Sequence, residues 1–335
     1  MPIPFILAGI ALAAGGYGVK KGFDAKKDFD HAKELNTEAK DIYDSAAQRL
    51  EYARDQTQEE MNELGQFKFE MYEERLIPFV NTFSKIKNVD FRDQQLQDEF
   101  NLNDLTQEDM RAIQKAALEM QEVVGAGITA LGAGGLAGLA VYGGVGWLAT
   151  ASTGTAIASL SGAAATNATL AWLGGGSLAA GGFGMAGGTA ILGGIVAGPV
   201  LAIGGMMLAS KAEEAKNNAY SNRDNARSAA EQMKTATIVT RAIGRRFNQI
   251  HSVLIQLDAV FQPLLLGLQK LVSKNTNYAT YSSDDRKGVM MAAMMAKTLK
   301  NILEVPILDE SGSLTTVSEQ ALLEAQQKTL EFSSR

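Results

Sequence analysis

Hydrophobic and polar positions follow a helical rhythm over most of the chain. From Asp24 to about Lys87, apolar residues recur three and four positions apart among charged ones, at Leu35, Ala39, Ile42, Ala46, Leu50 and Ala53. This spacing predicts a long two-faced helix. Pro78 should kink or interrupt it, because proline lacks a backbone N–H and clashes with the preceding turn.

A second helical stretch is predicted from Lys211 to Lys274, again with a proline, Pro263, in its far part. Its apolar stripe is continuous and comprises Ile243, Phe247, Ile250, Leu254, Leu257, Phe261, Leu264, Leu268 and Leu271. Shorter helices are predicted after Thr106, at Arg286–Leu303 and at Thr316–Leu330, with a polar loop at 278–285 and a turn at 305–312. No stretch has a strong strand pattern.

The rhythm stops between Val123 and Ser210, where 88 consecutive positions hold no Asp, Glu, Lys, Arg or His and 24 of the 34 glycines of the chain. Glycine inside a helix costs about 0.5–1 kcal/mol relative to alanine. A glycine-rich apolar run therefore suits helices that approach closely in lipid. Val123–Leu148 and Thr189–Ala209 are each long enough to cross a bilayer, and 168–173 could form a short helix between them. Leucine and isoleucine are diluted, so insertion is marginal and could be conditional.

Small residues four positions apart lie on one face of a helix, where a neighbouring helix can pack. We therefore predict a glycine zipper, with contacts at Gly134, Gly138, Gly154, Gly162, Gly184, Gly188, Gly194 and Gly198.

The N-terminal residues Pro4–Val19 are also uncharged and apolar, and Lys20, Lys21, Lys26 and Lys27 follow them. Because a signal peptide carries its positive charge before the apolar part, this order favours a short anchor with its basic flank inside. An amphipathic or core-packed terminal helix is the alternative.

The two helical arms carry opposite net charges. Residues 24–122 carry a net charge of −11 and residues 211–304 a net charge of +6. Arms of opposite charge can pair, so an antiparallel hairpin, with the glycine-rich segment at its tip and Pro78 near Pro263, is expected. The fold class is thus all-α, with long antiparallel helical arms flanking a glycine-rich transmembrane helical hairpin.

Catalytic motifs are not found. The glycines of 182–187 match a dinucleotide fingerprint by spacing, but no acidic residue or βαβ pattern follows. The chain has no cysteine, which excludes zinc–thiolate sites and cysteine nucleophiles. His31 and His251 are interpreted as surface or packing residues and the methionines at 290–295 as an adaptable packing face. We expect no enzyme activity, no cofactor and no metal.

One basic cluster is a candidate contact for an anion or nucleic acid: Arg241, Arg245 and Arg246. Guanidinium groups one helical turn apart can bind phosphates or carboxylates. Ion pairing with the acidic first arm is the simpler interpretation.

The blocks 152–162 and 168–188 resemble a glycine-rich block of bacterial membrane proteins, and the resemblance extends into 85–89 and 306–310. The chain is similar to effectors of bacterial anti-phage defence, of the channel-forming HalA type of the Hailong system. That resemblance implies a tetrameric ion channel held shut by single-stranded DNA, which a partner nucleotidyltransferase makes. No DNA-contact residue of the family can be matched here.

The sequence predicts a membrane effector that forms an oligomeric ion channel or pore gated by its arms, in the bacterial inner membrane with both arms in the cytoplasm. A secreted α-helical pore-forming toxin that inserts on release and a non-conducting membrane scaffold are the alternatives. The expected parts are an apolar anchor helix (1–22), an acidic helical arm (23–122), the glycine-rich transmembrane segment (123–210), a basic helical arm (211–275) and a C-terminal helical region (276–335), with coiled-coil pairing of the arms.

Overall fold

A computed structural model describes residues 19–91, 105–126, 136, 138–143, 212–309 and 312–333. These residues form helices joined by short turns, and in this part of the chain no strand occurs. Two isolated bridges, Lys87 with Asn277 and Leu308 with Leu314, are its only β-type pairings. The all-helical prediction is confirmed.

The chain folds as two compact units, and two long helices contribute to both: α1 (Val19–Met71) and α8 (Ala212–Lys274). Unit 1 comprises Met1–Gln56 and Gly193–Arg241. Its described core is a narrow, alanine-rich seam between α1 and α8, formed by Ala32, Leu35, Ala46, Leu50, Ala219, Ala229 and Met233. Small side chains at three- and four-residue spacing let the two backbones approach closely.

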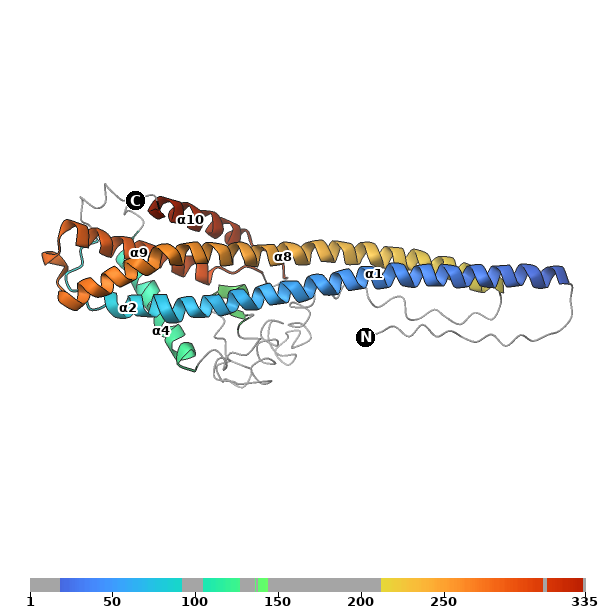
Figure 1. Cartoon of the computed structure of the whole chain (residues 1–335), viewed down its shortest axis with the longest axis horizontal. Coiled ribbons are helices and arrows are strands. Elements are labelled where there is room, and N and C mark those ends of the chain that lie inside the picture. Colours follow the sequence, from blue (N-terminus) through green and yellow to red (C-terminus); the bar gives the residue numbers. More distant parts are fainter. Residues whose placement is uncertain are drawn as a thin grey trace. The chain divides into compact units, whose positions relative to one another are not determined.

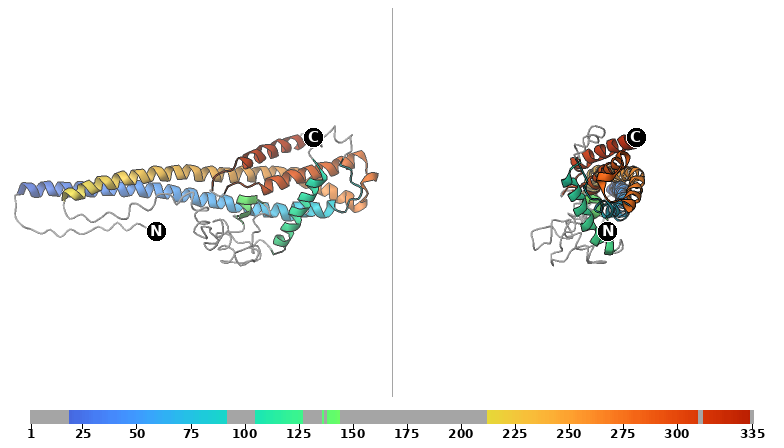
Figure 2. Two further views of the ribbon diagram at one scale, coloured as in Figure 1. Left: turned by 180° about the vertical axis from the view of Figure 1, so that it is seen from behind. Right: turned by 90° about the vertical axis from the view of Figure 1, so that its left-hand side faces the viewer.

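In unit 1, α1 and α8 run parallel, as the colour gradients of the two helices show in both views (Figures 1 and 2). Side-chain contacts follow the same order along both helices: His31 with Tyr220 at 3.0 Å, Asn36 with Asn222 at 3.0 Å and Glu38 with Arg227 at 2.8 Å. The expected antiparallel hairpin is therefore wrong. Only short loops force neighbouring helices to be antiparallel, whereas here the connection from α1 to α8 is long enough for the chain to return to its starting end.

Unit 2 comprises Thr57–Leu192 and Ala242–Arg335. Besides the later parts of α1 and α8 it contains η1 (Tyr72–Leu76), α2 (Ile77–Phe83), α4 (Gln107–Ala126), η3 (Leu139–Gly143), η8 (Tyr278–Thr280), α9 (Ser283–Glu304) and α10 (Thr316–Ser333). Helix α9 packs against α4, α10, η1 and η3 and so lies at the centre of this unit. Met290, Met294 and Met295 are buried on it, as their packing role predicts.

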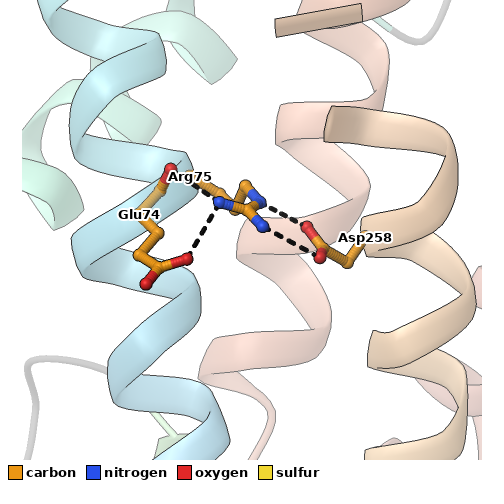
Figure 3. Close-up of polar contacts among 3 residues, drawn as sticks. All are labelled: Glu74, Arg75 and Asp258. Carbon is orange, nitrogen blue, oxygen red and sulfur yellow. Dashed lines mark hydrogen bonds and ion pairs between the residues drawn. The ribbon is translucent and has the colours of Figure 1, made fainter. Parts of the chain in front are cut away.

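The predicted interruption at Pro78 takes the form of a π-helical turn, η1, directly before α2. Proline cannot donate to the carbonyl four residues earlier, which belongs to Glu74. Arg75 replaces that donor: its Nη1 donates to the Glu74 carbonyl at 3.2 Å, while Nε and Nη2 donate to the Asp258 carboxylate at 2.6 and 3.2 Å (Figure 3). One side chain thus repairs the helix and joins it to α8.

The same parallel direction holds in unit 2. Phe79, next to Pro78, contacts Phe261, two residues before Pro263, with ring centroids 5.8 Å apart. Beyond both helices, Lys87 and Asn277 form a parallel bridge. The two proline-containing stretches are therefore side by side, as expected, but through parallel pairing.

Local signals in the sequence place two of the shorter helices. Thr106 and Asp109 cap α4 reciprocally, since the Thr106 hydroxyl accepts from the Asp109 amide at 3.1 Å and the Asp109 carboxylate accepts from the Thr106 amide at 2.7 Å. Ser282 and Asp285 form the same capping box before α9. Each box satisfies two backbone donors that a helix start leaves unpaired.

Candidate functional site: a docking site for the glycine-rich segment

Residues 136 and 138–143, inside the uncharged run, are part of unit 2, and Leu136 lies very close to Gly65 of α1. A Cβ atom at Gly65 would come 2.7 Å from the carbonyl carbon of Leu136 and closer still to its oxygen. No other residue can occupy position 65 unless the Leu136 backbone moves. The main chain at Leu136 therefore lies directly on α1.

One turn further along α1, Lys68 is fully buried, and its Nζ donates to the carbonyl oxygen of Ala140 at 3.1 Å. Burial lowers the pKa of Lys68 to about 7 by desolvation of the ammonium group. Lys68 lies four residues after Leu64 and four before Tyr72, so it occupies a core position of the helix and cannot reach water there.

The third contact comes from the turn between α9 and α10. The amide of Ile307 donates to the carbonyl oxygen of Val141 at 2.6 Å. The turn is itself braced by the bonds from Thr315 N to Ile307 O at 3.0 Å and from Asp309 N to Ser313 O at 2.9 Å. A braced turn thus holds the backbone of η3 through this hydrogen bond.

Apolar burial completes this docking site, which we define as Gly65, Lys68 and Ile307 with residues 136 and 138–143. Leu139 and Ala140 are 0 % exposed and Val141 is 1 % exposed. Removing such side chains from water gains about 25 cal/mol per Å² of apolar surface. The candidate span Val123–Leu148 therefore includes four core residues of unit 2, because Val123 at the end of α4 is also buried.

The surroundings of the docking site are polar in part. Tyr72 is fully buried, and its hydroxyl has no hydrogen-bond partner among the described residues. Desolvation, with the nearby Glu304 and Glu119 carboxylates, raises its pKa well above the usual value. Glu304 accepts an ion pair from Lys300 at 2.7 Å. An unsatisfied buried hydroxyl costs about 1–3 kcal/mol, so the Tyr72 hydroxyl lowers the stability of unit 2 beside the docking site.

Of the predicted packing glycines, Gly138 lies at the start of the docked stretch, where it is helical and buried. The others are outside the described residues: Gly134, Gly154, Gly162, Gly184, Gly188, Gly194 and Gly198. The N-terminal anchor, up to residue 18, is also outside them.

The three arginines of the candidate cluster have different surroundings. Arg246 is directed at α10, with Nη1 donating to the Ser318 hydroxyl at 2.8 Å and Nη2 3.8 Å from the Glu319 carboxylate. Its partners are thus not on the acidic first arm. Arg241 and Arg245 are exposed, and they belong to unit 1 and unit 2 respectively. They remain the accessible members of the predicted cluster.

The two histidines pack between helices. His31 Nε2 is 3.0 Å from the Tyr220 hydroxyl in unit 1, and the His251 ring is 4.8 Å from that of Phe67 in unit 2. Within the described ranges, no group of three His, Asp or Glu side chains is arranged to hold a metal ion.

Sequence reasoning missed Gly65 and Lys68, although both left a signal. Gly65 is the only glycine between Asp24 and Glu122, in a helix whose other small residues are alanines. Lys68 continues a four-residue stripe with Leu64, Tyr72 and Leu76, where an apolar residue is the norm. A glycine and a charge at core positions one turn apart point to a neighbouring backbone.

Searches of protein-family models, of curated proteins and of solved structures give no match to this chain. Among the described helices, the stretch Asn217–Lys274 of α8 is long and apolar enough to cross a membrane by length and composition, with 33 % of its most apolar window buried in the protein. This finding is consistent with membrane association, but a core helix of a soluble protein has the same length and composition.

Proposed function

We propose that the chain is a membrane effector that forms an oligomeric ion channel or pore, with the glycine-rich segment 123–210 as its transmembrane hairpin and the helical arms as its gate. The observation that carries the proposal is the docking site. A gate needs a direct contact between the arms and the pore segment, and Gly65, Lys68 and Ile307 supply three contacts to the backbone of residues 136–141.

Docking and insertion compete for the same residues. Leu139, Ala140 and Val141 are buried in unit 2, so they cannot face lipid at the same time. The docked arrangement is the closed state in this proposal, and release of residues 138–143 frees Leu139, Ala140 and Val141 for the membrane. Each state removes the same apolar side chains from water, so this burial favours neither state, and a ligand that binds one state better shifts the equilibrium toward it.

The cellular setting rests on the resemblance to HalA-type effectors. It supports an inner-membrane location, a tetramer, a role in anti-phage defence, and a single-stranded DNA signal made by a partner nucleotidyltransferase. Cytoplasmic arms follow from the lysines after the first apolar stretch. A reporter fused after Arg335 should therefore be active in the cytoplasm, and periplasmic activity would contradict this topology.

Ion flux through liposomes that contain the purified full-length chain tests the proposal. Gly65→Ala forces the Leu136 backbone away and should increase the flux several-fold over wild type. Gly267→Ala is the matched control, since its Cβ has no atom within 4 Å, and it should behave as wild type. Absence of flux from both wild type and Gly65→Ala in intact oligomers would leave the non-conducting scaffold as the function.

A secreted pore-forming toxin is the second candidate, and the burial of Leu139–Val141 in a helical unit favours it. Such toxins fold with the membrane segment hidden. Fractionation of producing cells separates the two: a channel stays with the membranes through carbonate washing, whereas a toxin is found in the soluble or extracellular fraction.

A further inference from the structure

Helix α10 carries a second stripe of uncharged residues on its outer face. Its inner face packs in unit 2 through Leu322, Ala325 and Phe332, which are buried. Leu323 and Leu330, on the outer face, are 60 % and 71 % exposed. They belong to an exposed stripe with alternating spacings of four and three residues: Thr316, Gln320, Leu323, Gln327 and Leu330. This spacing is that of the packing seam of a coiled coil, so the outer stripe of α10 fits a partner helix.

The borders of this stripe are acidic. Glu324 and Glu331 directly follow its two leucines, and Glu319 lies along its other edge; all three are exposed. In a coiled coil these flanking positions meet the flanking positions of the partner helix. Two parallel α10 helices would bring Glu319 and Glu324 together, and like charges repel. The stripe therefore fits a partner with basic borders better than a second α10.

The outer face of α8 in unit 1 has such borders. Ile238 is 60 % exposed, and it lies between Thr235 and Ala242 at the same three- and four-residue spacing. Lys234 and Arg241 directly precede these two residues and are exposed. In a parallel coiled coil, the residue before one core position faces the residue after the other core position on the partner helix. The basic pair of α8 thus occupies the positions that complement the acidic pair of α10.

The two charged pairs also match in spacing. Glu324 and Glu331 are seven residues apart, and so are Lys234 and Arg241. One parallel register therefore places Lys234 opposite Glu324 and Arg241 opposite Glu331 at the same time. No such match exists in the antiparallel direction, where the two acidic residues would face the uncharged edge of the α8 stripe.

Pairs within each helix do not prevent this contact. Lys234 lies 3.3 Å from Glu231, and Glu331 lies 3.4 Å from Lys328. Exposed ion pairs of this kind contribute little to stability, because they are well solvated and cost side-chain entropy. The side chains can therefore turn to a partner helix.

We propose that copies of this chain assemble by packing the outer stripe of α10 in one copy, in parallel, on the outer stripe of α8 in the next, with Leu323 against Ile238. The contact joins two different faces, and every copy carries both, so repeated contacts can close into a ring. The inference rests on the oligomer of the proposed function and identifies the surfaces that join its subunits. The contact is short for a stable interface, and tethering of the chains in one membrane raises their effective concentration.

Crosslinking between two differently tagged full-length chains tests the inference, because the natural chain has no cysteine. One chain carries Ile238→Cys and the other Leu323→Cys, and both are produced in the same cells. Oxidation of native membranes should join the two tags, since a disulfide requires Cα atoms within roughly 7 Å. Val317→Cys is the matched control for Leu323→Cys: Val317 is 53 % exposed on α10 but lies off the stripe, so it should stay reduced.

Reversal of charge tests the pairing directly. Lys234→Glu with Arg241→Glu, added to the Ile238→Cys chain, should lower the crosslink yield about tenfold by setting like charges together. Glu324→Lys with Glu331→Lys, added to the Leu323→Cys chain, should then restore the yield. Restoration also shows that the first pair of changes does not act by unfolding the chain. An unchanged yield after the first reversal overturns the inference.

The remaining outcomes separate the interface from the channel. Disulfides between two Leu323→Cys chains would show that α10 packs on itself, and disulfides confined to a single chain that carries both cysteines would show that the faces meet within one copy; either result overturns the inference. Ion flux from intact oligomers without the crosslink also overturns it but leaves the proposed channel. The crosslink without flux supports the interface and contradicts the channel.

Discussion

Replacement of Lys68 by methionine should stabilise unit 2 while loosening the docked segment. The buried ammonium has a pKa of about 7, whereas a solvated lysine titrates near 10.5. Each unit of this shift corresponds to about 1.4 kcal/mol, so the buried charge costs on the order of 5 kcal/mol at neutral pH. Loss of the hydrogen bond to the Ala140 carbonyl lowers the unfolding free energy of the variant by about 1.5–3 kcal/mol. We expect a net gain in unfolding free energy of about 2 kcal/mol for Lys68→Met.

The pH dependence gives a sharper test than the size of the effect. Between pH 7 and about 10 the unfolded chain binds a proton at position 68 that the folded chain has lost. Stability must therefore rise with pH across this window, by up to about 1.4 kcal/mol per unit, and the contribution is constant below pH 7. Above pH 10 the raised pKa of Tyr72 reverses the trend, because only the unfolded tyrosine ionises.

Urea unfolding of the full chain in detergent, followed by circular dichroism at pH 6, 7, 8, 9 and 9.5, measures both effects. Lys68→Met should lose most of the rise seen in wild type. Lys270→Met removes an exposed charge from α8, and this variant should keep the rise of stability with pH. A wild-type stability that does not change between pH 7 and 9.5 would refute the buried-charge reasoning.

Three further predictions concern the arms and the pore segment. Asp258→Asn removes the carboxylate of the bidentate pair in Figure 3 and should lower unfolding free energy by about 2–3 kcal/mol in urea titrations, which a loss below 0.5 kcal/mol would contradict. Gly134→Leu with Gly194→Leu should separate packed helices, so an unchanged oligomer by native mass spectrometry would exclude packing there. Arg241→Ala with Arg245→Ala should abolish salt-dependent oligonucleotide binding with little change in melting temperature, and salt-independent or absent wild-type binding would end that hypothesis.

The helices were predictable because their determinants are local. Alternating apolar and charged residues, the capping pair Thr106 and Asp109, and Pro78 each act within a few residues. The direction of the arms was not predictable from charge. Opposite net charges attract in either direction, and the bidentate bridge joins a base of the acidic arm, Arg75, to an acid of the basic arm, Asp258.

The docking site could not be predicted from the sequence, for a different reason. Hydropathy describes how well a residue tolerates lipid, and Leu139, Ala140 and Val141 tolerate a protein core equally well. Their partners act through backbone atoms: the room at Gly65, the carbonyl that binds Lys68, and the amide of Ile307. Backbone contacts of this kind leave no complementary pattern of side chains in the sequence.

Three features that weaken the local structure occur together around the docked segment. Lys68 buries a charge, Gly65 weakens the interior of α1, and the contacts lie beside two π-helical turns, η1 and η3. A segment that only completed a core would be better served by an apolar residue at 68. Natural chains depart from such rules mainly where function requires it. The coincidence therefore favours a contact with a role beyond core packing, because Gly65 and Lys68 each cost stability in α1 and yet both are needed for the contacts with Leu136 and Ala140.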